Sequence, residues 1–244
     1  MRGWWQEITG LVLPADCAGC GRQRTVLCER CRGALSGGPA RRVWPDPVSA
    51  GLPPVHAAAR YGDTVRSALL AHKERGALAL AGPLGAALAG AVHSVVHDRA
   101  GAPGGGIRAG AGPFLLVPVP SARRAVAARG HDAGRRIALA AARELRREGT
   151  PVRVAALLRQ RRLVADQSGL DAELRGANVS GALGVAEGAE RLLMGEEPVV
   201  LVDDLMTTGA SLTEAARAVS RAGGEVLGAA VVAAPSRSFG INRN

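Results

Sequence analysis

The chain has 244 residues, a length that suits one α/β domain with a small additional module. Hydrophobic residues make up 47% of it and aromatic residues only 2%, so Ala, Val and Leu must build the core. So few aromatic side chains argue against a surface that stacks nucleic-acid bases. The net charge of +10 predicts a basic surface that attracts anions, and direct nucleic-acid binding stays an alternative.

The basic residues are strongly biased in kind. All but one of the 31 are Arg, and Lys73 is the single lysine. This bias, combined with many Ala and Gly residues, is typical of GC-rich coding. The charge is therefore no evidence of DNA contact when taken alone.

The start of the chain is apolar but is interrupted by Gln6 and Glu7, and Asp16 stands where a secretion signal would have a small residue. No uninterrupted apolar run reaches the roughly 18 residues that span a bilayer. We therefore expect a short amphipathic helix at the start, no membrane span and a cytoplasmic protein.

Residues 1–35 contain every cysteine of the chain. The spacing is C-x2-C, seven residues, and C-x2-C again. Each C-x2-C pair turns two thiolates toward one point, and two pairs complete a tetrahedral set that suits a structural zinc ion. Two disulfides or redox-active thiols are the alternative, and disulfides fit a cytosolic chain poorly. The expected zinc ligands are Cys17, Cys20, Cys28 and Cys31.

The next segments follow a change in composition. Residues 36–54 are rich in Gly and Pro and predict a linker. An α/β domain is expected over 55–236 and a flexible tail over 237–244, with loops at 100–113 and 159–178. Alternation of strands and helices predicts a mostly parallel sheet flanked by helices. The expected strands are 55–61, 114–120, 152–158, 198–204 and 225–234, and the expected helices are 64–98 (broken near Gly76 or Gly82–Pro83), 132–148 and 211–223.

The segment 198–213, PVVLVDDLMTTGASLT, ends a buried strand with two adjacent carboxylates, Asp203 and Asp204. Ligands of open α/β sheets bind beyond the carboxyl ends of the strands. The helix that follows offers free N–H groups to an anion, and Gly209 allows a close backbone approach. This arrangement predicts a phosphate site beside two carboxylates, which would bind hydroxyls or a divalent cation. A sugar phosphate would satisfy both parts of such a site.

A simpler interpretation is a helix with an Asp N-cap and a Thr/Ser turn. It accounts for one carboxylate and one hydroxyl but leaves the other polar residues unexplained. The chain has neither a Walker A sequence nor a G-x-G-x-x-G sequence after its strands, so these two nucleotide-binding motifs are excluded.

The stretch VVLVDDLMTTGAS resembles the phosphoribosyl-pyrophosphate (PRPP) motif of type I phosphoribosyltransferases. Other segments are similar to the ComF group of that family: the four-cysteine module, LLVPVPSARRAVAARGHDAGRRIA, and ALLRQRRLVADQSGLDAELRGANVSGAL. The resemblance covers roughly residues 10–235 and implies the type I phosphoribosyltransferase fold.

This resemblance also implies roles for particular residues. Asp203 and Asp204 would hold the ribose 2′- and 3′-hydroxyls, Pro120 and Ser121 would lie near pyrophosphate, and Mg²⁺ would bridge pyrophosphate and ribose oxygens. The segment 159–178 would close over the site and exclude water from an oxocarbenium-like centre. The 5′-phosphate would be held by Thr207, Thr208, Gly209, Ala210 and Ser211, and the closing loop would supply Arg159, Arg161, Arg162 and Gln167.

The chain departs from the family at RGHDA, residues 129–133, where relatives carry R-G-F-N-Q. His131 is expected at an exposed helix start, with a ligand contact as the alternative, and Asp132 is expected to be an N-cap. The residues leave three functions open. The first is an enzyme that transfers phosphoribosyl from PRPP to an unidentified nitrogenous acceptor. The second is a non-catalytic partner of competence machinery or single-stranded DNA, and the third is a PRPP-sensing regulator. A homo-oligomer is a further expectation.

Overall fold

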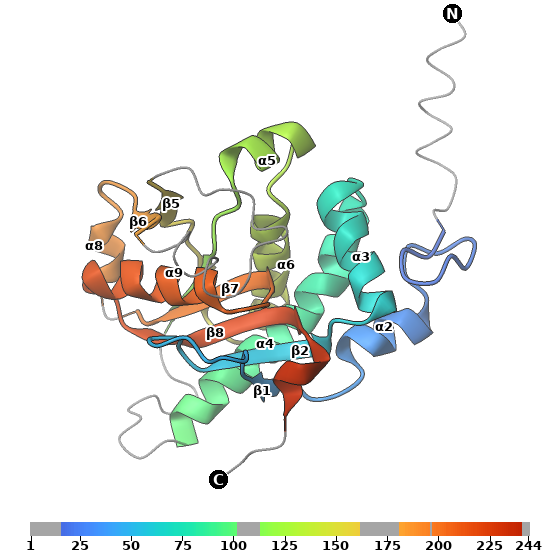
Figure 1. Cartoon of the computed structure of the whole chain (residues 1–244), viewed down its shortest axis with the longest axis horizontal. Helices are drawn as coiled ribbons and strands as arrows, with labels where there is room; N and C mark the ends of the chain where they lie inside the picture. The colour runs from blue at the N-terminus through green and yellow to red at the C-terminus, as the bar shows by residue number, and fades with distance from the viewer. Residues whose placement is uncertain (1–15, 102–112, 162–180, 196, 241–244) are drawn as a thin grey trace, which may run out of the picture.

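The computed structural model describes residues 16–101, 113–161, 181–195 and 197–240. A six-stranded sheet in the order β1-β2-β8-β7-β3-β4 lies at its centre (Figure 1). Strand β1 is antiparallel to β2 at one edge, and all the other neighbours are parallel. The predicted α/β class with a mostly parallel sheet is confirmed. The strands are β1 Arg41–Val43, β2 Val55–Arg60, β3 Phe114–Pro118, β4 Val152–Val154, β7 Val199–Leu205 and β8 Val226–Ala234.

Helices cover both faces of this sheet. The continuous Val/Leu run of β7 supplies both layers, because successive side chains of a strand point to opposite faces. Val200 and Val202 pack on the side of α4 and α6, while Val199 and Leu201 pack on the side of α9. The helices are α2 Glu29–Ser36, α3 Asp63–Glu74, α4 Ala81–Gly101, α5 Arg123–Arg129, α6 Ala133–Arg147, α8 Glu190–Leu193 and α9 Ala210–Arg221, with 3-10 turns η1 Leu78–Leu80 and η2 Ser236–Phe239.

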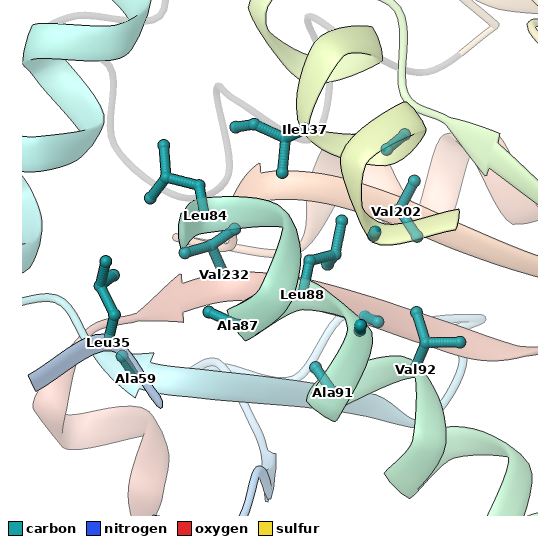
Figure 2. Close-up of a cluster of buried hydrophobic side chains, with 14 of the residues drawn as sticks. Leu35, Ala59, Leu84, Ala87, Leu88, Ala91, Val92, Ile137, Val202 and Val232 are labelled. Carbon is teal, nitrogen blue, oxygen red and sulfur yellow. The ribbon is translucent and has the colours of Figure 1, made fainter. Parts of the chain in front are cut away.

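The larger of the two cores lies between the sheet and α4 (Figure 2). Leu84 and Leu88 of α4 and Ile137 of α6 cluster near Val202 of β7. The two helices approach so closely that a Cβ on Gly85 would overlap Ala140. The same cluster includes Leu35 of α2, so the four-cysteine segment shares this core.

Several local predictions are confirmed. The long helical segment breaks at Gly76, which has a φ of +65° and separates α3 from η1 and α4. Asp132 caps α6, since its side chain accepts a hydrogen bond of 3.0 Å from the backbone N–H of Arg135.

Other elements differ from the prediction. The expected strand 152–158 is divided, because β4 ends at Val154 and Leu158 begins β5 (Leu158–Gln160). Strand β5 pairs in a separate antiparallel sheet with β6 (Leu183–Val185), and neither β6 nor α5 was expected. The predicted linker contains β1, and the predicted tail contains part of η2, whose Ser238 accepts a backbone hydrogen bond from Trp44.

One helical segment, Leu78–Ala100, is long and apolar enough by length and composition to cross a membrane. Half of it is buried within the fold, where α4 packs against β8, β2 and α6. A core helix of a globular domain meets the same criteria, so the segment is explained by its packing here.

Candidate functional site

β3 and β7 separate at their carboxyl ends, and this position between the two strand ends is termed the crevice. The pairing of β3 with β7 ends at Pro118, opposite Val202, whereas β7 continues beside β8 to Leu205. Asp203 and Asp204 therefore lie on the part of β7 that has β8 on one side and no β3 partner on the other. From β3 the chain passes through α6 on one face to β4, and from β7 it passes through α9 on the other face to β8. Such a switch point is where open α/β sheets bind ligands.

Asp204 is buried and its charge is paired. The ammonium Nζ of Lys73, in the last turn of α3, donates a hydrogen bond of 2.7 Å to Asp204 Oδ2. Burial acts to lower the pKa of Lys73, but the charges of Asp204 and Asp203 outweigh it and raise that pKa. Lys73 therefore carries its charge in the crevice and neutralises one of the two carboxylates.

Asp203 has a different environment. Its Oδ1 accepts a hydrogen bond of 2.8 Å from the backbone N–H of Asp204. Burial, and then the charge of Asp204, raise the pKa of Asp203 to about 8. The repulsion between the two adjacent carboxylates is thus relieved in two ways: Asp204 has a cation, and Asp203 holds its proton near neutral pH.

The turn after β7 leads directly to the N-terminus of α9. Gly209 precedes the helix with a φ of +77°, a backbone conformation that L side chains rarely adopt, and a Cβ there would lie 2.9 Å from Leu52 Cδ1. Thr208 accepts a hydrogen bond of 3.5 Å from the N–H of Ala210. Thr207 is exposed, and Thr208 and Ser211 are half-buried. These positions combine hydroxyl donors with the positive end of a twelve-residue helix.

A pocket of about 510 Å³ lies at the carboxyl ends of β3 and β4. It brings together three residues that the sequence predicts for the site: Pro120 and Ser121, from the turn after β3, and Arg159, from β5. Arg123 and Arg135 line it as well, so its charged lining residues are three arginines and one carboxylate, Asp132. The three guanidinium groups suit this pocket to an anion.

The other predicted loop residues are placed differently or lie outside the described residues. The backbone N–H of Arg161 bonds to Ala182 O at 2.8 Å, and its side chain lies so close to Gly184 that a Cβ there would overlap it. Arg161 is exposed and lies against β6. Arg162 and Gln167 fall in the segment 162–180, outside the described residues.

Two cationic residues had no predicted role: Lys73, which is paired with Asp204, and Arg129, which lies near Lys73. Lys73 donates a hydrogen bond to Asp204, and the positive charge of Arg129 acts to lower the pKa of Lys73. The only sequence signals were that Lys73 is the single lysine and that Arg129 begins the segment RGHDA, residues 129–133. His131, next to Arg129, is half-buried, and its ring nitrogens lie 3.0 Å from Arg129 O and 3.1 Å from His72 O. It joins α3 to the corner between α5 and α6.

The four cysteines converge at the edge of the larger core. Their sulfur atoms all lie within 4.8 Å of one another, and the sulfurs of Cys20 and Cys28 are 3.7 Å apart. Four Zn–S bonds of about 2.3 Å in a tetrahedron separate the sulfurs by roughly 3.8 Å, so the arrangement fits zinc. All four are free thiols rather than disulfides. The cluster could therefore hold a metal ion such as zinc.

The surroundings of the sulfurs favour a thiolate at Cys17 and a neutral thiol at Cys31 in the absence of a metal ion. Burial acts to raise the pKa of Cys17, but backbone N–H groups, first that of Cys28 at 3.3 Å, lower it overall to about 6. Burial raises the pKa of Cys31 to about 12, and a metal ion would supply the positive charge that this thiolate needs. Gly19 allows the close turn, since a Cβ there would lie 2.8 Å from the sulfur of Cys31.

Comparison with known proteins adds no family to this description. No model of a known protein family matches the chain, and no curated protein matches it. The geometry of the site and the motifs of the sequence therefore carry the functional proposal.

Proposed function

We propose that the chain is a type I phosphoribosyltransferase-like protein of the ComF group, which binds PRPP and transfers its phosphoribosyl group to a nitrogen nucleophile. The observation that carries this proposal is the position of Asp203 and Asp204. They lie in the crevice of a switch point, and the N-terminus of α9 begins six residues after Asp204. A ligand with a diol next to a phosphate matches both parts.

In this reaction the bond between ribose C1 and the pyrophosphate oxygen breaks, and its electron pair leaves with pyrophosphate. The lone pair of the acceptor nitrogen forms the new bond to C1, and a proton leaves the nitrogen. Asp203 and Asp204 would hold the ribose hydroxyls, and the turn Thr207–Ser211 would hold the 5′-phosphate. Pro120, Ser121 and Arg159 would face the pyrophosphate from their shared pocket, and closure of the segment 159–178 would exclude water.

A magnesium ion fits this site only together with the substrate. Asp204 is already bonded to Lys73, and Asp203 has a raised pKa, so these two carboxylates do not form a free pair for a cation. The diphosphate of PRPP supplies oxygen ligands of the kind that Mg²⁺ prefers. When bound, Mg²⁺ would neutralise charge on the leaving pyrophosphate.

The four cysteines are proposed to hold a structural zinc ion. Four thiolates leave no open coordination position for a substrate. Leu27, Cys31 and Leu35 belong to the larger core, so the metal would fix this segment against α3 and α4. Thiolate ligands persist in a reducing compartment, in keeping with a cytoplasmic protein.

Pyrophosphate release tests the reaction. The purified protein is incubated with PRPP, Mg²⁺ and a panel of nitrogenous bases, and pyrophosphate is measured against the Asp203→Asn/Asp204→Asn variant. Release that depends on a base and is lost in the variant supports transfer. Binding of PRPP without release favours the sensing regulator or the non-catalytic ComF-like partner, and absence of PRPP binding contradicts the proposal.

A further inference from the structure

Three of the five histidines of the chain line one pocket of about 380 Å³. His93 and His97 come from α4 and His56 comes from β2, at a place where these two elements pack together (Figure 1). Asp98 and Arg42 also line the pocket. None of its described lining residues belongs to the crevice or to the four-cysteine cluster. The pocket is therefore a separate feature that the proposed function does not use.

His93 and His97 form a potential chelating pair. Residues four positions apart in an α-helix lie on one face, and two histidines at this spacing can bind one metal ion. Both side chains are exposed, so an ion in solution can reach them. His93 Nε2 lies 2.6 Å from Glu148 Oε2 and donates to this carboxylate, which leaves the lone pair of its Nδ1 for a ligand bond. A carboxylate at the second ring nitrogen is the usual companion of a metal-binding histidine.

Asp98 adds a carboxylate beside this pair, and His56 holds it in position. Nε2 of the buried His56 lies 2.8 Å from Oδ2 of the exposed Asp98. The other ring nitrogen of His56, Nδ1, is buried and has no hydrogen-bond partner among the residues that the structure describes. A charged imidazole would need an acceptor at both nitrogens, so a neutral ring that donates from Nε2 fits this geometry. His56 thus orients Asp98 through Oδ2 and leaves Oδ1 for a further ligand.

The side chains of the pocket must rotate to meet at one ion. In the described ranges of the chain, three or more ligand atoms lie within 4.8 Å of one another at the four cysteines and not at the histidines. Exposed side chains change rotamer within nanoseconds, so His93 and His97 can turn toward a common point. Ordering two exposed side chains costs conformational entropy. A metal ion in this pocket would therefore bind less tightly than one held by the converging cysteines.

The charges around the pocket favour a cation over an anion. Arg42 alone would attract an anion, and its guanidinium lies over the ring of Trp44, 5.4 Å from the centroid. Two carboxylates, Asp98 and Glu148, contact the histidines and together outweigh this single positive charge. A neutral imidazole with an available lone pair also binds a metal cation and repels an anion.

We propose that His93, His97 and Asp98 bind a divalent transition-metal ion of the kind that imidazole ligands select, such as Zn²⁺ or Ni²⁺, in addition to the metal of the cysteine cluster. In this site His56 and Glu148 are positioning residues that orient Asp98 and His93. Two imidazoles and one carboxylate leave coordination positions open to water or to an external ligand, whereas four cysteines leave none. The inference does not depend on the proposed function.

Calorimetric titration of Zn²⁺ tests the site, with protein that has no polyhistidine tag and already contains one equivalent of zinc. We expect a second saturable step of about one ion per chain. His93→Ala and His97→Ala should each abolish this step, and Asp98→Asn should weaken it by about tenfold or more. Ser94→Ala is the matched control, because Ser94 lines the same pocket and has no part in the proposed ligand set. It should leave the second step unchanged.

Arg42→Gln distinguishes a cation site from an anion site. Removal of the opposing charge should tighten the second zinc step by about threefold to tenfold. Binding of inorganic phosphate that Arg42→Gln weakens, with no second zinc step, would show an anion site and overturn the proposal.

Thermal unfolding gives an independent measurement. Zinc added beyond one equivalent should raise the unfolding temperature of the unmodified protein and not that of His93→Ala/His97→Ala, because an ion that binds only the folded state stabilises it. The absence of a second calorimetric step in the unmodified protein, or its persistence in this double variant, would contradict the site. PRPP takes no part in these measurements, so their failure leaves the proposed function untouched.

Discussion

Lys73 Nζ lies 2.7 Å from Asp204 Oδ2, although the two residues are 131 positions apart in the chain. The pair joins the end of α3 to the end of β7 across the crevice. In the free protein it neutralises one of two adjacent carboxylates, and Asp203 is left to hold a proton. The two carboxylates are thus stabilised by a cation of the protein itself and by a retained proton.

The first prediction concerns the pH dependence of stability. The pKa of Asp203 is raised in the folded protein to about 8, whereas in the unfolded chain it is about 4. Folding therefore favours protonated Asp203. This contribution to stability is complete below about pH 4 and is lost as the pH rises toward about 8.

Urea unfolding of the free protein between about pH 5 and pH 8.5 measures this effect. We expect the unfolding midpoint of the unmodified protein to fall more steeply with rising pH than that of Asp203→Asn, which has no proton to lose. Glu225→Gln is the control, because the Glu225 side chain is exposed. Identical pH dependence in the unmodified protein and Asp203→Asn would show that Asp203 titrates normally.

The second prediction concerns zinc. Metal analysis of freshly purified protein should find about one zinc ion per chain, and a strong chelator should remove it. Since Cys31 and Leu35 belong to the core that includes α3 and α4, removal should lower the unfolding temperature by about 10 °C or more.

Cys17→Ser/Cys31→Ser provides the matched comparison. This variant should contain no zinc and should show no response to the chelator. A purified protein without metal, or a chelator effect of equal size in the variant, would contradict a zinc site at these cysteines.

The third prediction concerns the turn before α9. Gly209→Ala places a Cβ in a left-handed backbone conformation and against Leu52. It should destabilise the fold by about 1–2 kcal/mol and weaken the binding of ribose 5-phosphate, because the turn can no longer approach the phosphate. Gly90→Ala is the control: Gly90 lies in α4 with open space around it, and this change should stabilise the helix by about 0.5–1 kcal/mol. If Gly209→Ala and Gly90→Ala bound ribose 5-phosphate equally well, the turn at Gly209 would have no role in binding the phosphate.

Much of the fold could be predicted because its strongest signals are local. The apolar run of β7 predicted a strand buried on both faces, and Gly76 and Asp132 marked helix ends by their own backbone and capping chemistry. Helix α5 was missed because its seven residues bury no side chain and so carry no apolar stripe. The hairpin β5–β6 was missed because each strand has three residues and the partner lies more than twenty positions away.

The candidate site likewise has one part that the sequence predicts and another part that it does not. Asp203, Asp204 and Gly209 are neighbours in the chain, so one motif contains them all. Lys73 comes from α3 and reaches Asp204, while Arg129 of α5 reaches Glu74, the neighbour of Lys73 in α3. A lysine in one helix shows no pattern that links it to a carboxylate in a distant strand.

Calorimetric titration of PRPP with Mg²⁺ into the unmodified protein and into Asp203→Asn/Asp204→Asn tests the central claim most directly. We predict saturable binding to the unmodified protein and its loss in the double variant, which should keep its circular dichroism spectrum and its bound zinc. Unchanged PRPP affinity in the double variant would contradict a ribose-binding role for the two carboxylates.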